Sequence, residues 1–368
     1  MVWYERGILP GEQGDLIRFG PAFGCGGYGS LHYLTTSDGE LYAVKRTDIG
    51  PFLVEEGKKV WQRKQILLYG GCVREGLVLG CEDLQEIVPK GRGFDVIFEV
   101  ARDGSIHTVA YQAMDWIASQ TLREKLDAGI APRESARAGL YLIEALDTLH
   151  GRGVTWGDVK PENVLWDDKV HAAIDFQLSH HTLELLSGCP ERYLTALRMA
   201  QELEKESLKL KTVSGTPPYL SYEMLTGAEG ASPRHDRYAA AVTAFELLTG
   251  RNPAYVCSAV AEGADSREKL DAIVEFVRST LVPDALRRNL EILKETLFTS
   301  LGEDRDVSDK IAAGLYSALG PERDLYLLTT ALELLEDRSR QSLLVTGSGK
   351  MDCFVTEACG PVSFSLPN

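Results

Sequence analysis

Short apolar runs rich in β-branched and aromatic residues fill roughly the first hundred positions of the chain. Turn sequences such as "SDGE" and "ARDGS" separate these runs, and together they predict a series of strands. One helical segment is expected to interrupt the strands, somewhere within 53–86. From about residue 120 onward, apolar positions recur at helical spacing. They predict helices at 121–128, 133–150, 192–210, 234–249, 265–280, 283–300 and 323–337.

One of these predicted helices is apolar on nearly every face. It carries the run "RYAAAVTAFELLTG" and ends at Gly250, a residue type that often follows a helix. A helix that is apolar all round is usually buried among other elements. A mostly β unit followed by a mostly helical unit indicates an α+β fold, with the joint near "MDWIASQ".

Composition limits the classes of function. The chain has 368 residues, 44% of them hydrophobic, which is enough for a sizeable core in two lobes. Its net charge of −15 argues against a broad surface for nucleic acid or anionic membrane. The N-terminal stretch lacks the apolar core of a signal peptide, and no apolar run approaches membrane-spanning length.

The seven cysteines are scattered, and no Cys-x-x-Cys pair occurs among them. A zinc site or a disulfide framework is therefore not expected. Reduced thiols are typical of the cytosol, so the sequence predicts a cytoplasmic location and leaves the nucleus open.

The stretch "GVTWGDVKPENVLWDD" at 153–168 carries a carboxylate, a cation and an amide on one polar loop. They belong to Asp158, Lys160 and Asn163, and Asp175 follows at the end of a probable strand, "AAIDF". For any one of these residues, a plain polar turn is an equally good interpretation. The whole combination favours a functional site.

A glycine-rich stretch, "FGCGGYGS", lies near the start of the strand region. Gly24, Gly26 and Gly29 have G-x-G-x-x-G spacing, which is a weak signal because dinucleotide-binding folds share it. Such a dinucleotide loop should open a helix, whereas the residues that follow here resemble strands. A glycine hairpin over nucleotide phosphates is the other interpretation, with Lys45 reaching them as a cation or lying solvated at an edge.

These motifs occur together in the order found in eukaryotic-type protein kinases, which the chain resembles over roughly 18–345. The shared segments are "GCGGYGS", "AVK", "GDVKPENVL", "IDF", "GTPPYLSYE", "DRYAAAVTAFELLTG" and "EDRSR". The resemblance implies a bilobal fold with a small β-rich N-lobe, one main helix in it, and a larger helical C-lobe. It divides the chain into an N-lobe at 1–113, a hinge at 114–120, a C-lobe at 121–345 with an activation segment at 175–223, and a tail at 346–368.

The resemblance also implies roles in phosphoryl transfer. Asp158 would orient the substrate hydroxyl and accept its proton, while Lys160 would hold the transferred phosphoryl group. Asn163 and Asp175 would bind Mg²⁺, a hard cation that prefers oxygen ligands. ATP contacts are implied for Gly24, Gly26, Gly27, Tyr28, Gly29, Leu31, Ala43, Lys45, Glu75, Met114, Asp115, Trp116 and Ile117.

Members of the family pair the strand lysine with a glutamate on the small lobe's helix. Counting forward from Lys45 reaches Lys64 rather than an acid, whereas alignment from "VREGLVLG" selects Glu75. If Glu75 is the partner of Lys45, the chain has roughly a dozen more residues within 48–74 than is usual in the family. Glu55 and Glu56 are the alternative partners. Two structural roles are implied as well: Asp236 would brace the catalytic loop, and Glu223 would pair with Arg340.

Several positions depart from the family pattern. Trp156-Gly157 replaces His-Arg, and that arginine normally binds a phosphate on the activation segment, so such phosphorylation is expected to be unnecessary. Trp156 is expected to pack in the core against Phe176. Gln177 replaces a glycine, and its Cβ should disfavour backbone states that swing Asp175 away from the metal.

The segment between Asp175 and Glu223 is longer than usual and contains a charged helix at about 190–210. This helix is either a solvated surface or a docking and regulatory element, and its charges favour a surface position near the acceptor platform. His180 and His181 beside "DFQLS" are expected to be exposed loop residues rather than metal ligands.

The leading interpretation is a Ser/Thr protein kinase that uses ATP and Mg²⁺ on a protein substrate. Lys160, two positions after Asp158, and "GTPPY", before Glu223, resemble the corresponding segments of protein kinases that act on Ser and Thr. The alternatives are a pseudokinase scaffold and a small-molecule phosphotransferase of the aminoglycoside or choline kinase kind, whose His-Gly-Asp loop is similar to Trp156-Gly157-Asp158.

Overall fold

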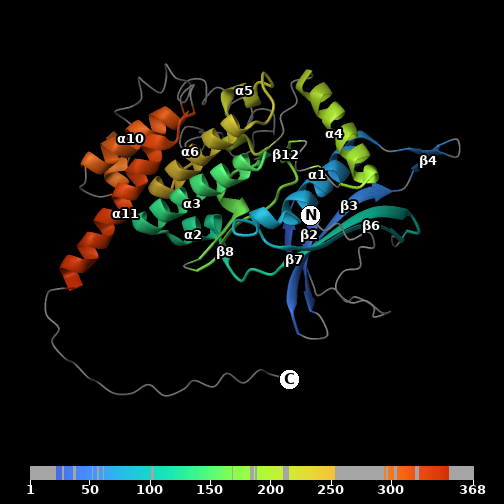
Figure 1. Ribbon diagram of the computed structural model, residues 1–368, viewed down its shortest axis with the longest axis horizontal. Coiled ribbons are helices and arrows are strands. Elements are labelled where there is room, and N and C mark those ends of the chain that lie inside the picture. The colour runs from blue at the N-terminus through green and yellow to red at the C-terminus, as the bar shows by residue number, and fades with distance from the viewer. Residues whose placement is uncertain are drawn as a thin grey trace.

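A computed structural model of the protein gives the arrangement of most of the chain (Figure 1). The expected helix at 265–280, most of the one at 283–300, Gly27, Tyr28 and nearly all of the tail lie outside the described residues. The structure describes residues 22–26, 29–35, 39–51, 53–55, 58–60, 62–100, 103–167, 169–182, 186, 189–209, 215–252, 294–295, 297–301, 305–319 and 323–347.

The strand-rich region forms a five-stranded antiparallel sheet with the order β1-β2-β3-β7-β6. Alternating buried and exposed β-branched or aromatic residues favour this arrangement, with Val44 and Val109 among the buried ones. The strands are β1 (Ala22–Gly26), β2 (Gly29–Thr35), β3 (Leu41–Pro51), β6 (Gly91–Val100) and β7 (Ile106–Asp115).

A hairpin of β4 (Leu53–Glu55) and β5 (Lys58–Val60) follows β3 and precedes helix α1 (Arg63–Leu79). The long β3 and this hairpin account for the extra residues expected within 48–74. Helix α1 begins at a capping box, in which Gln62 and Gln65 satisfy each other's backbone amides. A short 3₁₀ turn, η1 (Glu82–Leu84), then leads to β6.

Helices dominate the rest of the described chain. The sheet-rich lobe followed by a helical lobe is the bilobal α+β fold expected from the sequence (Figure 1). The main helices are α2 (Leu122–Ala128), α3 (Pro132–Gly151), α4 (Glu191–Lys209), α5 (Tyr222–Leu225), α6 (Pro233–Thr249), α10 (Arg305–Leu319) and α11 (Tyr326–Gly347).

Short strands and 3₁₀ turns connect these helices and carry most of the motif residues. They are β8 (Gln120–Thr121), β9 (Val154–Thr155), η2 (Pro161–Asn163), β10 (Val164–Trp166), β11 (His171–Ala173), β12 (His180–His181) and η3 (Pro217–Tyr219).

Helix α6 lies inside the helical lobe, as its apolar sequence predicts, and ends at Gly250 in a left-handed conformation with φ of 68°. One continuous hydrophobic core joins α6 and α3 to the α1 residues Val73 and Leu77. Helix α1 therefore packs on the helical lobe as well as on the sheet.

Two sequence predictions for the C-terminal helices were wrong. Helix α10 was not predicted, and the last helix begins at Tyr326 rather than at 323. The side chain of Arg340, which was expected to pair with Glu223, lies outside the described residues. Within them, Arg323 donates from Nη2 to Glu223 Oε2 at 3.1 Å. Arg323 is buried and covers the Tyr238 ring, so the ion pair forms just before α11.

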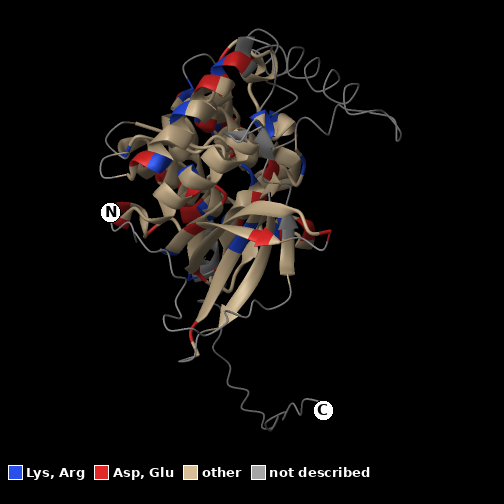
Figure 2. Cartoon of the chain, turned by 90° about the vertical axis from the view of Figure 1, so that its right-hand side faces the viewer, with Lys and Arg blue, Asp and Glu red and all other residues tan. Residues whose placement is uncertain are grey.

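Figure 2 shows acidic and basic residues interspersed over both lobes of the described chain. Among the helices of that part of the chain, none is both long and apolar enough to cross a bilayer.

Candidate active site

Lys45 lies on β3 between two neighbouring strands, opposite Leu31 of β2 and Gln112 of β7. Its ammonium lies 2.9 and 3.1 Å from the two carboxylate oxygens of Glu75 on α1, and 2.8 Å from Asp175 Oδ1. The sequence left three acids open for this pairing, and the structure selects Glu75. Gln112 supports the arrangement by donating to the Cys72 carbonyl of α1 at 2.8 Å.

One ammonium thus faces two carboxylates in a largely buried position. Burial by itself opposes the charged lysine, but Glu75 and Asp175 outweigh it and hold the pKa of Lys45 above its ordinary value. For Glu75, burial outweighs the attraction of Lys45 and raises the pKa of its carboxyl group. Both pKa shifts are expected when one ammonium group is shared between two carboxylates. The cluster therefore has an excess of negative charge, which favours the binding of a further cation.

Asp175 has a left-handed backbone, with φ of 60°. Such a conformation is uncommon for a residue with a side chain and is often found at functional sites. It aims the carboxylate at Lys45, as expected for Asp175 in its metal-facing position. Gln177 itself has no positive φ, so the strain lies two residues before it.

Asn163 lies beside Asp175, because the Asn163 carbonyl accepts the N–H of Ile174 at 2.9 Å. Its side-chain amide nitrogen donates to the backbone oxygen and the carboxylate of Asp158. These bonds leave the side-chain oxygen of Asn163 as the atom suited to a cation.

The geometry fits Mg²⁺ bound together with nucleotide phosphates. Asp175 and Asn163 offer oxygen donors beside an excess of negative charge, and phosphate and water oxygens would complete an octahedral shell. In the described part of the chain, no group of three or more His, Cys, Asp and Glu side chains forms a metal site without such help.

Asp158 is nearly buried and is held from several sides. Lys160 donates to Oδ2 at 2.6 Å, and the hydroxyl of Thr216 donates to Oδ1 at 2.7 Å. Lys160 also contacts the Thr216 hydroxyl at 2.8 Å, so a carboxylate, a cation and a hydroxyl form one network. Thr216 was not among the predicted site residues, although its place in "GTPPY" was the available signal.

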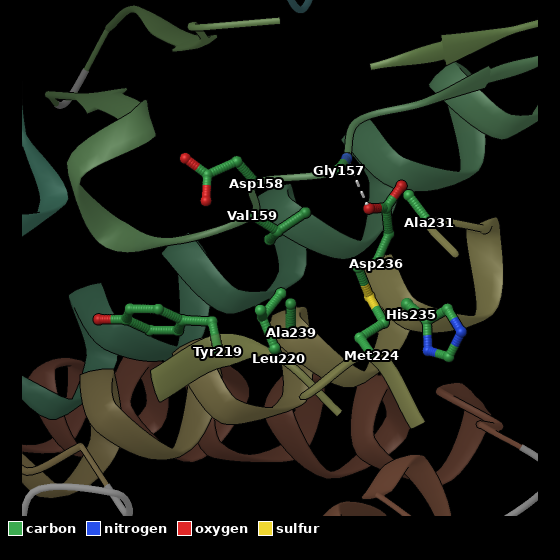
Figure 3. Close-up of a pocket in the computed structure, with 10 residues that line it drawn as sticks. All are labelled: Gly157, Asp158, Val159, Tyr219, Leu220, Met224, Ala231, His235, Asp236 and Ala239. Carbon is green, nitrogen blue, oxygen red and sulfur yellow. Dashed lines mark hydrogen bonds between the residues drawn. The ribbon is translucent and has the colours of Figure 1, made fainter. Parts of the chain in front are cut away.

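Asp236 of α6 braces the loop that carries Asp158, as expected. Its carboxylate accepts the backbone N–H of Gly157 at 2.9 Å (Figure 3). It also accepts the backbone N–H of Trp156 at 2.7 Å, and His150 lies 2.9 Å away. A cavity of about 10 Å³ lies below this loop, and Asp158 points away from it in Figure 3. The cavity has room for about one water molecule, so it is not a substrate site.

The backbone at Gly157 admits no side chain. Its φ is 85°, and a Cβ there would lie 2.4 Å from the Leu178 carbonyl oxygen. An arginine at this position would therefore require a different loop. Trp156 stacks on Phe176 with ring centroids 5.3 Å apart, and both rings are fully buried, as expected.

The glycine-rich hairpin pairs Gly26 with Gly29 at the turn between β1 and β2. Gly29 approaches β3 so closely that a Cβ would lie 2.5 Å from the Arg46 carbonyl oxygen. Leu31 lies further along β2, and its side chain lies next to Gly24 of β1. The hairpin is thus in position to cover a ligand next to Lys45.

The hinge region begins at the end of β7. Met114 pairs with Ala43 and packs with it and Leu79 in a small buried cluster. Trp116 lies edge-on to Phe23 and Tyr33 at 5.0 and 4.8 Å, so its ring supports the glycine hairpin.

Part of the hinge backbone is already bonded. The N–H of Asp115 donates to the Lys90 carbonyl, and the carbonyl of Ile117 accepts from Ser119. The Asp115 carboxylate is paired with Arg92. The N–H and the carboxylate of Asp115 and the carbonyl of Ile117 are therefore engaged within the protein.

The expected place of the inserted helix was wrong. Helix α4 packs along α1 instead of forming a surface element at the acceptor platform (Figure 1). Its buried face comprises Tyr193, Ala196, Leu197 and Ala200. The mixed charges that suggested a solvated helix occupy the opposite face, with Glu191, Arg198, Glu202 and Lys205 more than half exposed. Docking of a partner there is untested.

The expected exposure of both histidines was also wrong, since His180 and His181 are partly buried in β12, which pairs with β9. His181 lies 2.8 Å from the Ser179 hydroxyl. Burial, together with the nearby Arg74 and His180, lowers the pKa of His181 to about 3.

The family model described as "Protein kinase domain" matches residues 18–298. The chain is 30% identical to Protein kinase 3 of Dictyostelium discoideum over 59% of its length, and 29% identical to the probable serine/threonine-protein kinase PknB of Bifidobacterium longum over 44%. It is 31% identical to CBL-interacting serine/threonine-protein kinase 18 of Arabidopsis thaliana over 39%. The matches cover 22%, 21% and 25% of those relatives, respectively.

Proposed function

Because the chain belongs to the protein kinase family, we propose that it transfers the γ-phosphoryl group of Mg-ATP to a Ser or Thr hydroxyl of a protein substrate. We propose further that this activity does not require phosphorylation of the activation segment. Two side-chain networks carry the proposal: Lys45 with Glu75 and Asp175, and Asp158 with Lys160 and Asn163. A backbone bond from Ile174 to Asn163 holds them next to each other.

Each group in these networks has a task in the proposed transfer. Lys45, held by Glu75, contacts phosphate oxygens of the bound nucleotide, and Asp175 and Asn163 hold Mg²⁺, which neutralises phosphate charge when bound. Asp158 orients the substrate hydroxyl and accepts its proton as the new O–P bond forms, while the bond between the γ-phosphorus and the bridging oxygen breaks and ADP leaves. Lys160 stabilises the negative charge on the phosphoryl group in transit.

The choice of Ser and Thr rests on the acceptor side of the site. Thr216 of the "GTPPY" segment bonds both Asp158 and Lys160, which sets the platform close to the catalytic loop. Two of the relatives carry serine/threonine-protein kinase in their names. The independence from phosphorylation rests on Gly157, whose place has no room for a phosphate-binding arginine.

The test is transfer of radiolabelled phosphate from ATP to a generic protein acceptor, with phosphatase-treated protein. Asp158→Asn, Asp175→Ala and Lys45→Met should each lower kcat by about 10²–10⁴-fold, since each removes a group that acts in transfer. Removal of Mg²⁺ with a chelator should abolish transfer. The matched control is Asp167→Asn, because Asp167 only accepts backbone amides in an exposed turn.

The alternatives give different results. Nucleotide binding without any transfer would identify a pseudokinase scaffold. Label on an aminoglycoside or on choline, with none on protein, would identify a small-molecule phosphotransferase. An unchanged rate in Asp158→Asn would remove the proposed proton acceptor, and activity that needs a phosphorylated Thr212, Ser214 or Thr216 would contradict the proposed independence.

A further inference from the structure

Helix α1, which carries Glu75, is held by two separate parts of the 175–223 segment. On one side, a Cβ at Gly70 would lie 2.5 Å from the Ala200 Cβ of α4. On the other side, a Cβ at Gly71 would lie 3.0 Å from the Gln177 carbonyl oxygen. Adjacent glycines thus let two segments approach α1 more closely than any larger residue would allow.

An ion pair links the same two helices one turn further along. Arg74 of α1 donates from Nη1 to Glu204 Oε1 of α4 at 2.6 Å, and only 4% of the Arg74 side chain is exposed. A buried guanidinium requires a negative partner, because an unpaired charge there would be strongly destabilised. In the described part of the chain, Glu204 is the carboxylate that pairs with Arg74.

Arg74 directly precedes Glu75, so the position of one constrains the other. The Glu75 carboxylate accepts the backbone N–H of Phe176 and pairs with Lys45 at 2.9 Å. A movement of α1 away from both the sheet and α4 would therefore break the Lys45–Glu75 pair and the Arg74–Glu204 pair together.

We propose that Glu204 and Arg74 are positioning residues, through which α4 holds α1 where Glu75 meets Lys45. The carboxylate of Glu204 supplies the anion that the buried guanidinium of Arg74 requires. This inference rests on the proposed function, and it identifies the contact that keeps Glu75 next to Lys45. It also accounts for an inserted helix whose buried face packs mainly on α1.

The experiment is a charge exchange across the two helices. Arg74→Glu and Glu204→Arg should each lower kcat about 5- to 150-fold, the usual range for energetic coupling between sites, and the double variant should recover most of the loss. The matched control reverses an exposed pair on the same helix, Glu202→Lys with Lys205→Glu, which should leave kcat unchanged. The KM for the protein acceptor should stay constant throughout.

A steric exchange tests the same contact without altering charge. Gly70→Ala should lower kcat because the new methyl group meets Ala200, and adding Ala200→Gly should restore it. Melting temperatures identify any variant whose loss comes only from unfolding. This second pair keeps the test decisive if a reversed charge prevents folding.

Hydrogen exchange of the amides in 63–79 separates this inference from the proposed function. Faster exchange there in each single variant, reversed in each double variant, supports the positioning role even if the wild type transfers no phosphate. Folded single variants with wild-type kcat and wild-type exchange would overturn it. Double variants that remain as impaired as the singles would also overturn it.

Discussion

At the scale of single residues, two left-handed backbone positions shape the catalytic region. Gly157 has φ of 85° and Asp175 has φ of 60°. The conformation costs glycine little, whereas a residue with a Cβ stores about 1–3 kcal/mol in it. Lys45 offsets that cost at Asp175 by attracting its carboxylate at 2.8 Å. The metal-facing arrangement is therefore held by a side-chain contact and not by backbone preference.

Replacing Gly157 tests how firmly this loop is fixed. We expect Gly157→Ala to destabilise the protein by more than about 2 kcal/mol, because the strain of positive φ adds to contact with the Leu178 carbonyl oxygen. The control is Gly129→Ala, where φ is 89° and no atom lies within 4 Å of the new Cβ. That variant should lose about 1–2 kcal/mol in urea unfolding. Equal losses in the two variants would show that the loop moves aside.

At the scale of elements, Arg123 joins four separate segments of the helical lobe. From α2 it donates to Glu162 of η2 at 2.9 Å, and to Tyr219 of η3 and Glu246 of α6, both at 2.8 Å. Tyr219 completes the network by donating to Glu246 at 2.7 Å. No local sequence pattern indicates this link, since its members lie up to 123 positions apart.

Arg123→Met should therefore destabilise the helical lobe by on the order of 3 kcal/mol, since it leaves the buried Glu246 without its cation. The control is Lys125→Met on the same helix, where the ion pair with Glu134 is partly exposed. That change should cost no more than about 1 kcal/mol. Urea unfolding measures both, and a cost for Arg123→Met no larger than the control's would contradict the network's importance.

At the scale of the whole molecule, the net charge of −15 and the buried histidines act on pH stability in opposite directions. Acidification reduces the repulsion among carboxylates. It also protonates His181 in the unfolded chain, while the folded protein keeps this ring neutral because burial lowers its pKa to about 3. The histidine contribution is thus fully present above about pH 6.5 and is lost progressively toward pH 3.

Replacing His181 should make the free energy of unfolding less dependent on pH at the acidic end of the range. Between about pH 6.5 and 5, the wild type should lose at most about 1.4 kcal/mol per pH unit more than His181→Asn. Arg74 and His180 face the same ring and remain in the variant, so the difference reports His181 alone. Thermal melts at fixed ionic strength measure it. Parallel pH profiles would show that His181 is accessible to protons in the folded state.

Local patterns in the sequence determined the order of strands and helices and the identity of most motif residues. Helices α3 and α6 follow from apolar spacing and glycine ends, because these signals act within a few turns of chain. Asp158, Lys160 and Asn163 could be singled out because they lie close together on one short loop, and the structure joins their side chains by hydrogen bonds.

The tertiary structure alone decided which distant residues meet. Glu75 faces Lys45, Arg323 faces Glu223, and α4 turns its apolar face to α1. A charged helix looks alike in sequence whether its apolar stripe meets solvent, a partner or another helix. The choice depends on the summed packing and pairing of segments far apart in the chain, which short-range spacing does not encode.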